Sequence, residues 1–366
     1  MTVSTEHAIS HFDGTSIYKR SDADCILSST ERRLSLINPQ SLPIAGLRSI
    51  SKDGEYPTNE DVPREVLSFE QCPLSIFDLD EVIWPHIWAV VRAVGEATGK
   101  QITMEYYRKF CNTRKIPEWK DDPDIMRVHD QIVWGEHPDF YPYVNEAYFE
   151  AIRTLRAVER MGHGFFYQTS RPPKVLEATL RTIDWNGMPR NVEQNGRLDP
   201  FCDGELKNGT VYCGDGLPML VDRTSEPKRD VLEHWLKNLR GKGWRGEMVV
   251  VDDLQIPFEG LLKRQEIIGV ALQGDVNASI APLPGELRVD SWKEISDILM
   301  QVHERAVSSE SSPYRIFEHQ GRRLIVDKNE AGTGVFNLNT ISKSAWRWED
   351  MDAHSGVQED FKQISG

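Results

Sequence analysis

Four aspartates follow two separate apolar segments of the chain, Asp78 and Asp80 after the first and Asp252 and Asp253 after the second. Carboxylate oxygens are the ligands that a hard cation such as Mg²⁺ prefers. Three or four carboxylates brought together would repel one another strongly unless positive charge lay among them. If the fold places these acids at one site, the cluster itself therefore predicts a bound divalent metal.

Two hydroxyl side chains and one guanidinium stand at the end of another apolar segment. The Thr169 hydroxyl, or that of Ser170 in its place, could donate a hydrogen bond to a phosphoryl oxygen. Arg171 could bind a phosphate or another substrate anion through its forked guanidinium, and an ordinary surface arginine at a helix start explains it equally well. These residues are the predicted substrate-binding group.

A lysine supplies the positive charge that such a cluster needs. Lys228 lies 24 residues before Asp252, at the start of an amphipathic helical pattern. A carboxylate that attacks a phosphoryl group requires compensating positive charge, because both reactants are negative. Lys207 and Arg229 are competing candidates for this role.

The segments around these residues predict a parallel β-sheet with helices on both faces. Strands alternate with helical patterns, and several strands are apolar throughout, which is typical of strands buried on both faces. In such a sheet ligands bind where the strands reach their carboxyl ends. The predicted strands are residues 74–77, 163–169, 248–251 and 267–272, with further short pieces at 210–213 and 219–221.

The order and character of these clusters resemble the haloacid dehalogenase (HAD) superfamily. Its first motif, hhhDxDx[TV], is met by Ser75-Ile76-Phe77-Asp78-Leu79-Asp80-Glu81-Val82. Its second motif, a Thr or Ser that ends a strand, is met by Thr169, and its lone lysine by Lys228. Its fourth, an acidic pair after an apolar strand, is met by Asp252-Asp253. Each motif alone is weak, but the four together span residues 74 to about 275 in the family's order.

The resemblance implies a HAD-like Rossmannoid core and a reaction through an aspartyl-phosphate. Asp78 would be the nucleophile, and Asp80 would protonate the leaving oxygen and then activate the water that releases phosphate. Mg²⁺ would be bound by Asp78 and the main chain of Asp80. On the family pattern Asp253 would be a further direct ligand, with Asp252 in support.

Two details of the sequence bear on this resemblance. Family members that cleave carbon–halogen bonds generally lack an acid at the position of Asp80, so its presence favours phosphoesters. Thr169 and Lys228 would complete the catalytic set. Many members also place another acid or an Asn shortly after the fourth motif, whereas this chain continues with Leu254-Gln255-Ile256-Pro257-Phe258-Glu259.

The insertion between the first two motifs is expected to select the substrate. Residues 85–150 show helical spacing and no convincing strand, and in the family an insertion here is a helical cap. Twelve of the chain's 33 aromatic residues lie within residues 81–150, enough to stack a flat leaving group such as a nucleoside. A role in the cap's own core explains them better.

The chain as a whole divides into four parts by this interpretation. An N-terminal extension precedes a core in two pieces, a cap interrupts the core, and a C-terminal extension with a possible β-hairpin follows. The expected bounds are residues 1–70 for the first extension, 71–84 and 151–305 for the core, 85–150 for the cap, and 306–366 for the last.

Composition excludes several classes of protein. The 43 Lys and Arg against 57 Asp and Glu give a net charge of −14, which argues against general nucleic-acid binding. No apolar run of about 18 residues could cross a membrane, and the polar N-terminus lacks the pattern of a secretory signal. The five cysteines are scattered without metal-ligand spacing, so free thiols in the cytoplasm are expected.

We therefore expect a Mg²⁺-dependent phosphatase of the cytoplasm that acts on a small phosphorylated metabolite, with nucleotides among the candidates. A phosphotransferase or mutase would use the same aspartyl-phosphate but exclude water. A catalytically inactive HAD-like binding or scaffold protein is the alternative from another class.

Overall fold

The computed structural model describes the chain from residue 63 to residue 350 with several gaps. Most of the predicted N-terminal extension, the end of the C-terminal extension and residues 134–146 of the predicted cap lie outside the described residues. The described ranges are 63–110, 115–133, 147–171, 175–191, 208–213, 227–274, 280–319, 322–334 and 342–350.

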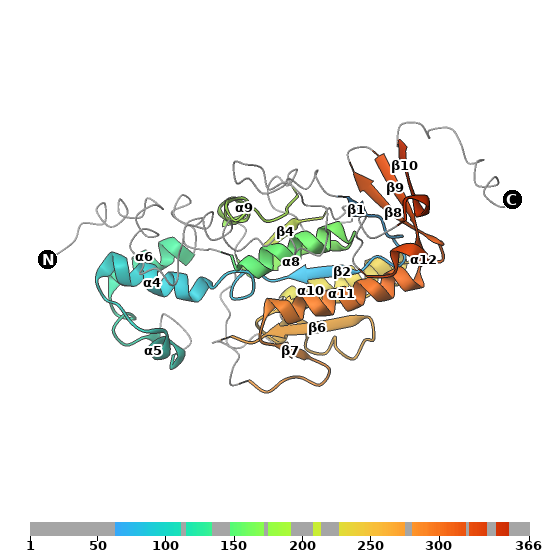
Figure 1. The fold of residues 1–366 in the computed structure, drawn as a ribbon. Coiled ribbons are helices and arrows are strands. Elements are labelled where there is room, and N and C mark those ends of the chain that lie inside the picture. Colours follow the sequence, from blue (N-terminus) through green and yellow to red (C-terminus); the bar gives the residue numbers. More distant parts are fainter. Residues whose placement is uncertain are drawn as a thin grey trace, which may run out of the picture.

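A six-stranded parallel sheet forms the centre of the molecule (Figure 1), which confirms the predicted α/β class. Its order is β4-β3-β2-β5-β6-β7, and every neighbouring pair is parallel. Five of the predicted strand segments are present, the predicted piece at 219–221 lies outside the described residues, and β7 was not predicted. The strands are β2 (Leu74–Phe77), β3 (Gly164–Thr169), β4 (Thr210–Cys213), β5 (Met248–Asp252), β6 (Ile267–Leu272) and β7 (Leu287–Val289).

Helices cover both faces of this sheet, as the apolar strands predict. The alternation of side chains along β2 sends Phe77 to one face and Ile76 to the other, each into a separate core cluster. The Phe77 face is covered by α8 (Phe149–Arg160), α9 (Leu176–Trp185) and α11 (Trp292–Ser309). The Ile76 face is covered by α10 (Pro227–Gly241) and the short η5 (Ile256–Phe258).

The strand order reverses between β2 and β5. The chain passes from β2 outward to β3 and β4, and then returns to the other side of β2 with β5. In open parallel sheets, this reversal point is where loops diverge and leave a crevice at the carboxyl ends of the strands. The segments that follow β2 and β5 therefore meet at the position where a ligand site is expected.

In the described part of the insertion, three helices follow β2, namely α4 (His86–Thr98), α5 (Met104–Arg108) and α6 (Pro123–Val133). They lie together at one end of the molecule in Figure 1, and α4 contacts α6. Ile116, Trp119 and Ile125 are fully buried among them, and the Trp119 indole N–H donates to the Lys100 carbonyl at 3.2 Å. At least this aromatic residue packs the interior of the helical insertion.

A second sheet stands at the opposite end of the molecule (Figure 1). It is antiparallel, with the order β1-β8-β9-β10, and β8 and β9 form the pair of strands expected after residue 306. Its first strand comes from the other end of the chain, a pairing that the sequence did not predict. The strands are β1 (Arg64–Glu65), β8 (Tyr314–His319), β9 (Arg322–Asp327) and β10 (Trp346–Asp350).

A buried ion-pair network joins this second sheet to the core. The Glu65 carboxylate accepts hydrogen bonds from Nε and Nη2 of Arg315, both at 2.6 Å, and lies 3.1 Å from Nε2 of His303 on α11. Arg315 also donates to the carbonyls of Gly332 and Gly334. Burial alone would raise the pKa of Glu65, but the bonds from Arg315 and His303 lower it below its ordinary value. The network therefore holds β1, β8 and α11 together through charge.

A close approach of backbones reinforces this junction. Gly162, just after α8, has a φ of 72°, and a Cβ there would lie 2.0 Å from the Glu65 carbonyl oxygen. Only glycine permits both the left-handed conformation and this contact.

Within the described residues, none of the helices combines the length and the apolar character that crossing a bilayer requires.

Removing the guanidinium of Arg315 should destabilise the protein strongly. Arg315→Met leaves the Glu65 carboxylate buried without its main partner, a change that typically costs about 3–5 kcal/mol. The matched control is Arg323→Met, which loses an exposed ion pair with Glu318 and should cost less than about 1 kcal/mol. Urea unfolding measures both, and equal losses would contradict a structural role for the buried network.

Acid should destabilise the protein through His163, which is fully buried against His303 with ring centroids 5.5 Å apart. Burial, and then the charge of His303, lower the pKa of His163 well below its ordinary value. Below a pH of about 6.5, His163 therefore binds a proton in the unfolded chain but stays neutral in the folded protein.

The free energy of unfolding should accordingly fall as the pH drops from about 6.5 toward the lowered pKa, by at most about 1.4 kcal/mol per pH unit. His163→Gln should flatten this slope between pH 7.5 and 5 in urea unfolding series. Glu65 contributes at lower pH, below its unfolded pKa of about 4.3, so the two effects separate. Identical slopes in the two proteins would contradict the assignment.

Candidate active site

Asp78 lies at the carboxyl end of β2, beside the end of β5. Phe77 pairs with Val251 in the parallel ladder, and the Asp78 amide continues it by donating to the Val251 carbonyl at 2.9 Å. This register brings Asp78 next to Asp252, the last residue of β5, and to Asp253 beyond it. Two segments more than 170 residues apart in sequence thus meet at the strand-order reversal.

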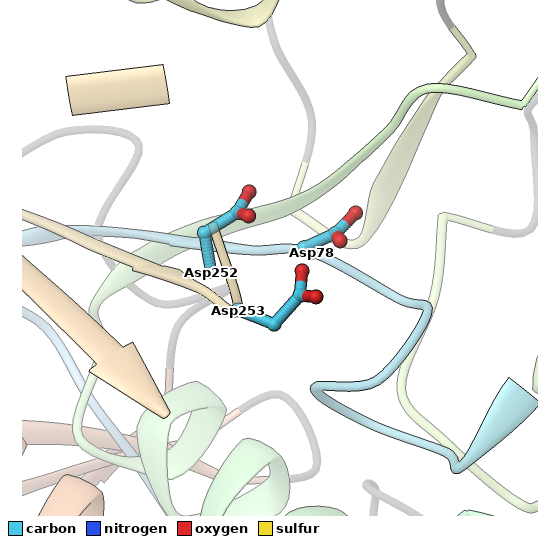
Figure 2. Close-up of side chains that lie close together, drawn as sticks. All are labelled: Asp78, Asp252 and Asp253. Carbon is cyan, nitrogen blue, oxygen red and sulfur yellow. The ribbon is translucent and has the colours of Figure 1, made fainter. Parts of the chain in front are cut away.

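The three aspartates converge on one point (Figure 2). One carboxylate oxygen each from Asp78, Asp252 and Asp253 lies within 4.8 Å of the others, and all three residues are buried. This distance allows a single cation to contact all three side chains. Three of the four acids that follow the two strands thus lie at one edge of the sheet.

Lys228 supplies the cation of this cluster. Its Nζ lies 2.8 Å from Oδ2 of Asp252 and 2.9 Å from Oδ1 of Asp78. The lysine is in the first turn of α10, where an exposed lysine would be unfavourable for the helix dipole. Gln168 on β3 fixes this turn, because its side-chain amide donates to the Lys228 carbonyl at 3.0 Å. Of the competing candidates, Lys207 lies outside the described residues, and Arg229 pairs with Asp230 instead.

Burial governs the charges of this cluster. It raises the pKa of Asp78 to about 8, against the opposing effect of Lys228 and with the repulsion of Asp252 and Asp80 adding to the rise. The pKa of Asp253 is also raised well above its ordinary value, by burial and then by Asp252 and Asp78. Burial alone would lower the pKa of Lys228, but Asp252 and Asp78 raise it, so the lysine stays charged. One charged lysine thus faces three carboxyl groups, and the raised pKa values of Asp78 and Asp253 show that these two resist ionisation without further positive charge.

The donor set fits a magnesium ion. Oδ1 of Asp78 is buried and, despite the nearby Nζ, accepts no hydrogen bond from any described residue. Asp252 is different, because Oδ1 accepts from the Leu254 amide at 2.9 Å while Oδ2 accepts from Lys228. Hard oxygen donors and a surplus of negative charge are what Mg²⁺ prefers. The geometry favours Asp78 and Asp253 as direct ligands and Asp252 as the residue that orients Lys228.

Thr169 ends β3, the other neighbour of β2, and is buried. Its hydroxyl oxygen accepts a hydrogen bond from the Arg171 amide at 3.3 Å. A hydroxyl has a single hydrogen to donate, and this arrangement leaves that hydrogen for another acceptor. The adjacent Ser170 is exposed.

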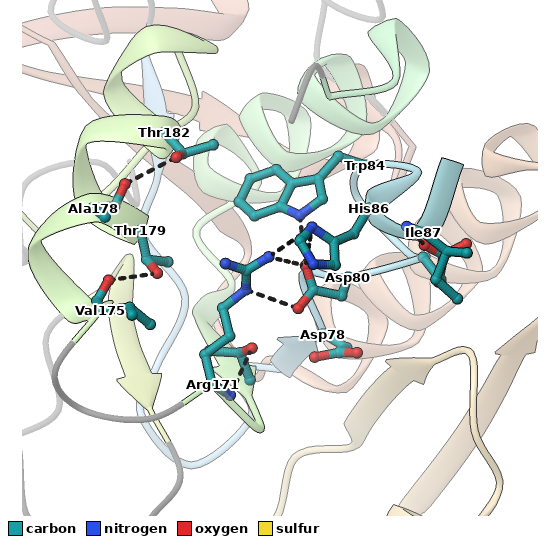
Figure 3. Close-up of polar contacts among 12 residues, drawn as sticks. Asp78, Asp80, Trp84, His86, Ile87, Arg171, Val175, Ala178, Thr179 and Thr182 are labelled. Atoms are coloured by element: carbon teal, nitrogen blue, oxygen red, sulfur yellow. Dashed lines mark hydrogen bonds and ion pairs between the residues drawn. The ribbon is translucent and has the colours of Figure 1, made fainter. Parts of the chain in front are cut away.

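Asp80 lies apart from the three-aspartate cluster, in a cage of donors (Figure 3). Arg171 donates from Nε to Oδ2 at 2.7 Å and from Nη2 to Oδ1 at 2.5 Å, and the Trp84 indole N–H donates to Oδ1 at 2.8 Å. His86 is 3.8 Å from the same oxygen. Burial alone would raise the pKa of Asp80, but Arg171, with His86 and Trp84, lowers it to about 2. Asp80 is therefore a carboxylate in this structure.

The loop after β2 is conformationally constrained. Glu81 has a φ of 60°, unusual for a residue other than glycine, and its carboxylate accepts from the Ile87 amide at 2.6 Å. Ile87 is in the first turn of α4, whose N-cap residue Pro85 provides no side-chain bond. The Glu81 side chain thus accepts a hydrogen bond from a backbone amide in the first turn of α4, which has no partner within the helix. It also links the Asp80 loop to the helical insertion.

The structure brings most of the predicted site residues together and adds others. Asp78, Asp252, Asp253 and Lys228 form one cluster, and Thr169 ends the next strand. Two groups of residues were not predicted. Trp84 and His86 lie around Asp80, and only their closeness to it in the sequence could have indicated this. Nothing in the sequence indicated that Gln168 holds the turn of Lys228.

Comparison with known proteins gives structural matches only. No family model matches the chain, and a search of curated proteins finds no relative. A HAD-family hydrolase of Deinococcus radiodurans with bound phosphate and sodium is 18% identical, with 64% of this chain and 97% of that chain covered and a TM-score of 0.41.

Two further solved structures match the chain with similarly low sequence identities and TM-scores. A HAD-superfamily hydrolase of Geobacter sulfurreducens is 17% identical, with 62% and 96% of the two chains covered and a TM-score of 0.38. A Bacillus subtilis protein assigned as a HAD hydrolase, with bound magnesium, is 12% identical, with 63% and 99% covered and a TM-score of 0.37. At these values, the chemistry proposed for this chain depends on its own residues.

Magnesium should stabilise the folded protein through the three aspartates. A ligand that binds only the folded state adds about 2.7 kcal/mol of stability at 100 times its dissociation constant. Asp253→Asn should remove most of this gain, whereas the exposed control Asp121→Asn should keep it. Thermal unfolding over a MgCl₂ titration measures the effect, and an equal gain in both variants would place the ion elsewhere.

Proposed function

We propose that this protein is a Mg²⁺-dependent phosphoester hydrolase that acts on a small phosphorylated metabolite through an aspartyl-phosphate. The observation that carries the proposal is the convergence of Asp78, Asp252 and Asp253 around the single ammonium group of Lys228. The HAD-type order of the motifs supports it, and so does the position of the site at the carboxyl ends of β2 and β5.

Charge explains why these residues form a phosphate site rather than a purely structural one. A buried carboxylate cluster with a deficit of positive charge is costly to maintain, so a structural role alone does not account for it. A bound Mg²⁺ would supply the missing charge and, as a Lewis acid, would make a phosphoryl group easier to attack. Asp78 and Asp253 are the residues that would hold it.

In the first step, an oxygen of Asp78 attacks phosphorus and the bond to the leaving oxygen breaks. Because Asp80 is a carboxylate in this structure, it must first take up a proton, from solvent or from the water of the preceding turnover. It then gives that proton to the leaving oxygen, which departs as an alcohol. Lys228 and the Thr169 hydroxyl hold the phosphoryl oxygens, whose negative charge would otherwise repel Asp78. In the second step, water attacks the aspartyl-phosphate, and phosphate leaves with Asp78 restored.

The helical insertion is the proposed source of substrate selection. The burial of Trp119 assigns one of its aromatics to packing, and a nucleotide remains one candidate class of substrate beside sugar phosphates and lipid phosphates. A phosphate-release screen over these three classes, with Mg²⁺ present, identifies the leaving group.

The nucleophile is tested by substitution. Asp78→Asn should lower the kcat for 4-nitrophenyl phosphate at least about 100-fold, because the amide cannot form the covalent intermediate. The control Asp121→Asn, an exposed acid of the insertion, should keep full activity. Full activity of Asp78→Asn, with wild-type dependence on Mg²⁺, would overturn the proposal. Phosphate transfer to an added alcohol in place of water would instead identify a phosphotransferase.

A further inference from the structure

The two carboxylate oxygens of Asp80 are bonded unequally. Oδ1 accepts two hydrogen bonds, from Nη2 of Arg171 and from the Trp84 indole. Among the described residues, Oδ2 accepts one hydrogen bond, from Nε of Arg171. A carboxylate oxygen has two lone-pair positions, so Oδ1 is saturated by the described residues while Oδ2 retains one position. Oδ2 is therefore the atom of Asp80 that can accept a further proton.

Arg171 is itself held in place, so it can fix the carboxylate. Its side chain is 5% exposed, its guanidinium carbon lies 6.0 Å from the Trp84 ring centroid, and Nη2 lies 3.1 Å from Nδ1 of His86. Its amide donates to the Thr169 hydroxyl. Figure 3 shows the guanidinium facing the Asp80 carboxylate, with Trp84 and His86 around the pair. The side edge of the guanidinium, Nε with Nη2, is engaged by Asp80, so this edge is not available to fork onto a phosphate.

We propose that Arg171 is a positioning residue that acts through Asp80, and not the substrate-anion ligand that its place after Thr169 suggests. It fixes the carboxylate so that Oδ2 is the base for the water that hydrolyses the aspartyl-phosphate. The water oxygen bonds to phosphorus while one of its protons passes to Oδ2 of Asp80. The bond between phosphorus and the Asp78 oxygen breaks, and its electron pair returns to Asp78. The inference rests on the proposed function and adds a residue to it.

The second step can be isolated with 4-nitrophenyl phosphate. Its leaving group departs as a stable anion and needs little help from an acid, so the first step is little affected by changes at Asp80. Misplacing the base should therefore slow mainly the second step, the hydrolysis of the aspartyl-phosphate. Stopped-flow measurement of nitrophenolate release separates a fast first turnover from the steady state. Acid quenching followed by mass spectrometry measures the fraction of enzyme that carries a phosphoryl group.

Three variants and one control are compared in the presence of Mg²⁺. Arg171→Gln removes the fork, Asp80→Asn removes the base, and the double variant tests whether the two act as one unit. The control is Arg190→Gln, because Arg190 forms the same two-bond pair with Asp184 at 2.5 and 2.8 Å on the end of α9. None of the hydrogen bonds described for Arg190 joins it to a site residue.

Arg171→Gln should lower kcat about 10- to 100-fold, in the range typical of a misplaced general base, with kcat/KM within about 3-fold of wild type. Phosphoenzyme should accumulate in this variant and in Asp80→Asn, and the double variant should lose little more than Asp80→Asn alone. Arg190→Gln should behave as wild type. If Arg171→Gln does not fold, Arg171→Lys, which keeps the charge but loses the fork, should show the same accumulation more weakly.

A different pattern would overturn the inference. If Arg171 binds the substrate phosphate, Arg171→Gln will raise KM, lower kcat/KM as much as kcat, and accumulate no phosphoenzyme. Losses that multiply in the double variant would likewise show that the two residues act independently. If wild type and Asp80→Asn both lack phosphoenzyme and Asp78→Asn stays active, the proposed function itself has failed, an outcome distinct from a failure of the role of Arg171 alone.

Discussion

The ion pairs of Lys228 with Asp78 and Asp252 are the interaction on which the site depends. Inside a protein, charges interact far more strongly than in water, and a buried carboxylate without compensation is expensive. One ammonium group within 3 Å of two carboxylates allows them to be buried side by side, yet a third, Asp253, stands in the same space. Among the described residues the cluster therefore has more negative than positive groups, and this imbalance is the basis of the proposed divalent cation and phosphorylated ligand.

The fold serves this interaction by bringing distant segments together. The reversal of strand order places β5 beside β2, so that Asp252 follows its strand next to Asp78. The first turn of α10 places Nζ of Lys228 within 2.9 Å of Asp78 and Asp252. β3 contributes Thr169 and also Gln168, whose side-chain amide donates to the Lys228 carbonyl. The second sheet lies at the other end of the molecule and is held by its own buried network around Glu65 and Arg315. The two charge clusters are thus separated by the length of the sheet.

The sequence was sufficient to predict the parallel sheet and the convergence of its acids, because apolar runs that end in polar residues have a direct structural meaning. It was insufficient for the second sheet, since the two-residue β1 has no pattern of its own and pairs with a strand about 250 residues away. The partner of Arg171 was unpredictable for a similar reason. A guanidinium can fork onto a phosphate or a carboxylate, and only the fold decides that Asp80 is the nearer anion. Trp84 and His86 reach Asp80 through the conformation of one loop, which sequence spacing does not reveal.

The most direct measurement of the central claim is a crystal structure of the protein with Mg²⁺ and beryllofluoride, which mimics a phosphoryl group on a carboxylate. The account predicts beryllium bonded to an Asp78 oxygen, a metal ion in contact with Asp78 and Asp253, and fluorides facing Lys228 and Thr169. Beryllofluoride bound away from Asp78, or a metal ion that does not contact these aspartates, would contradict it.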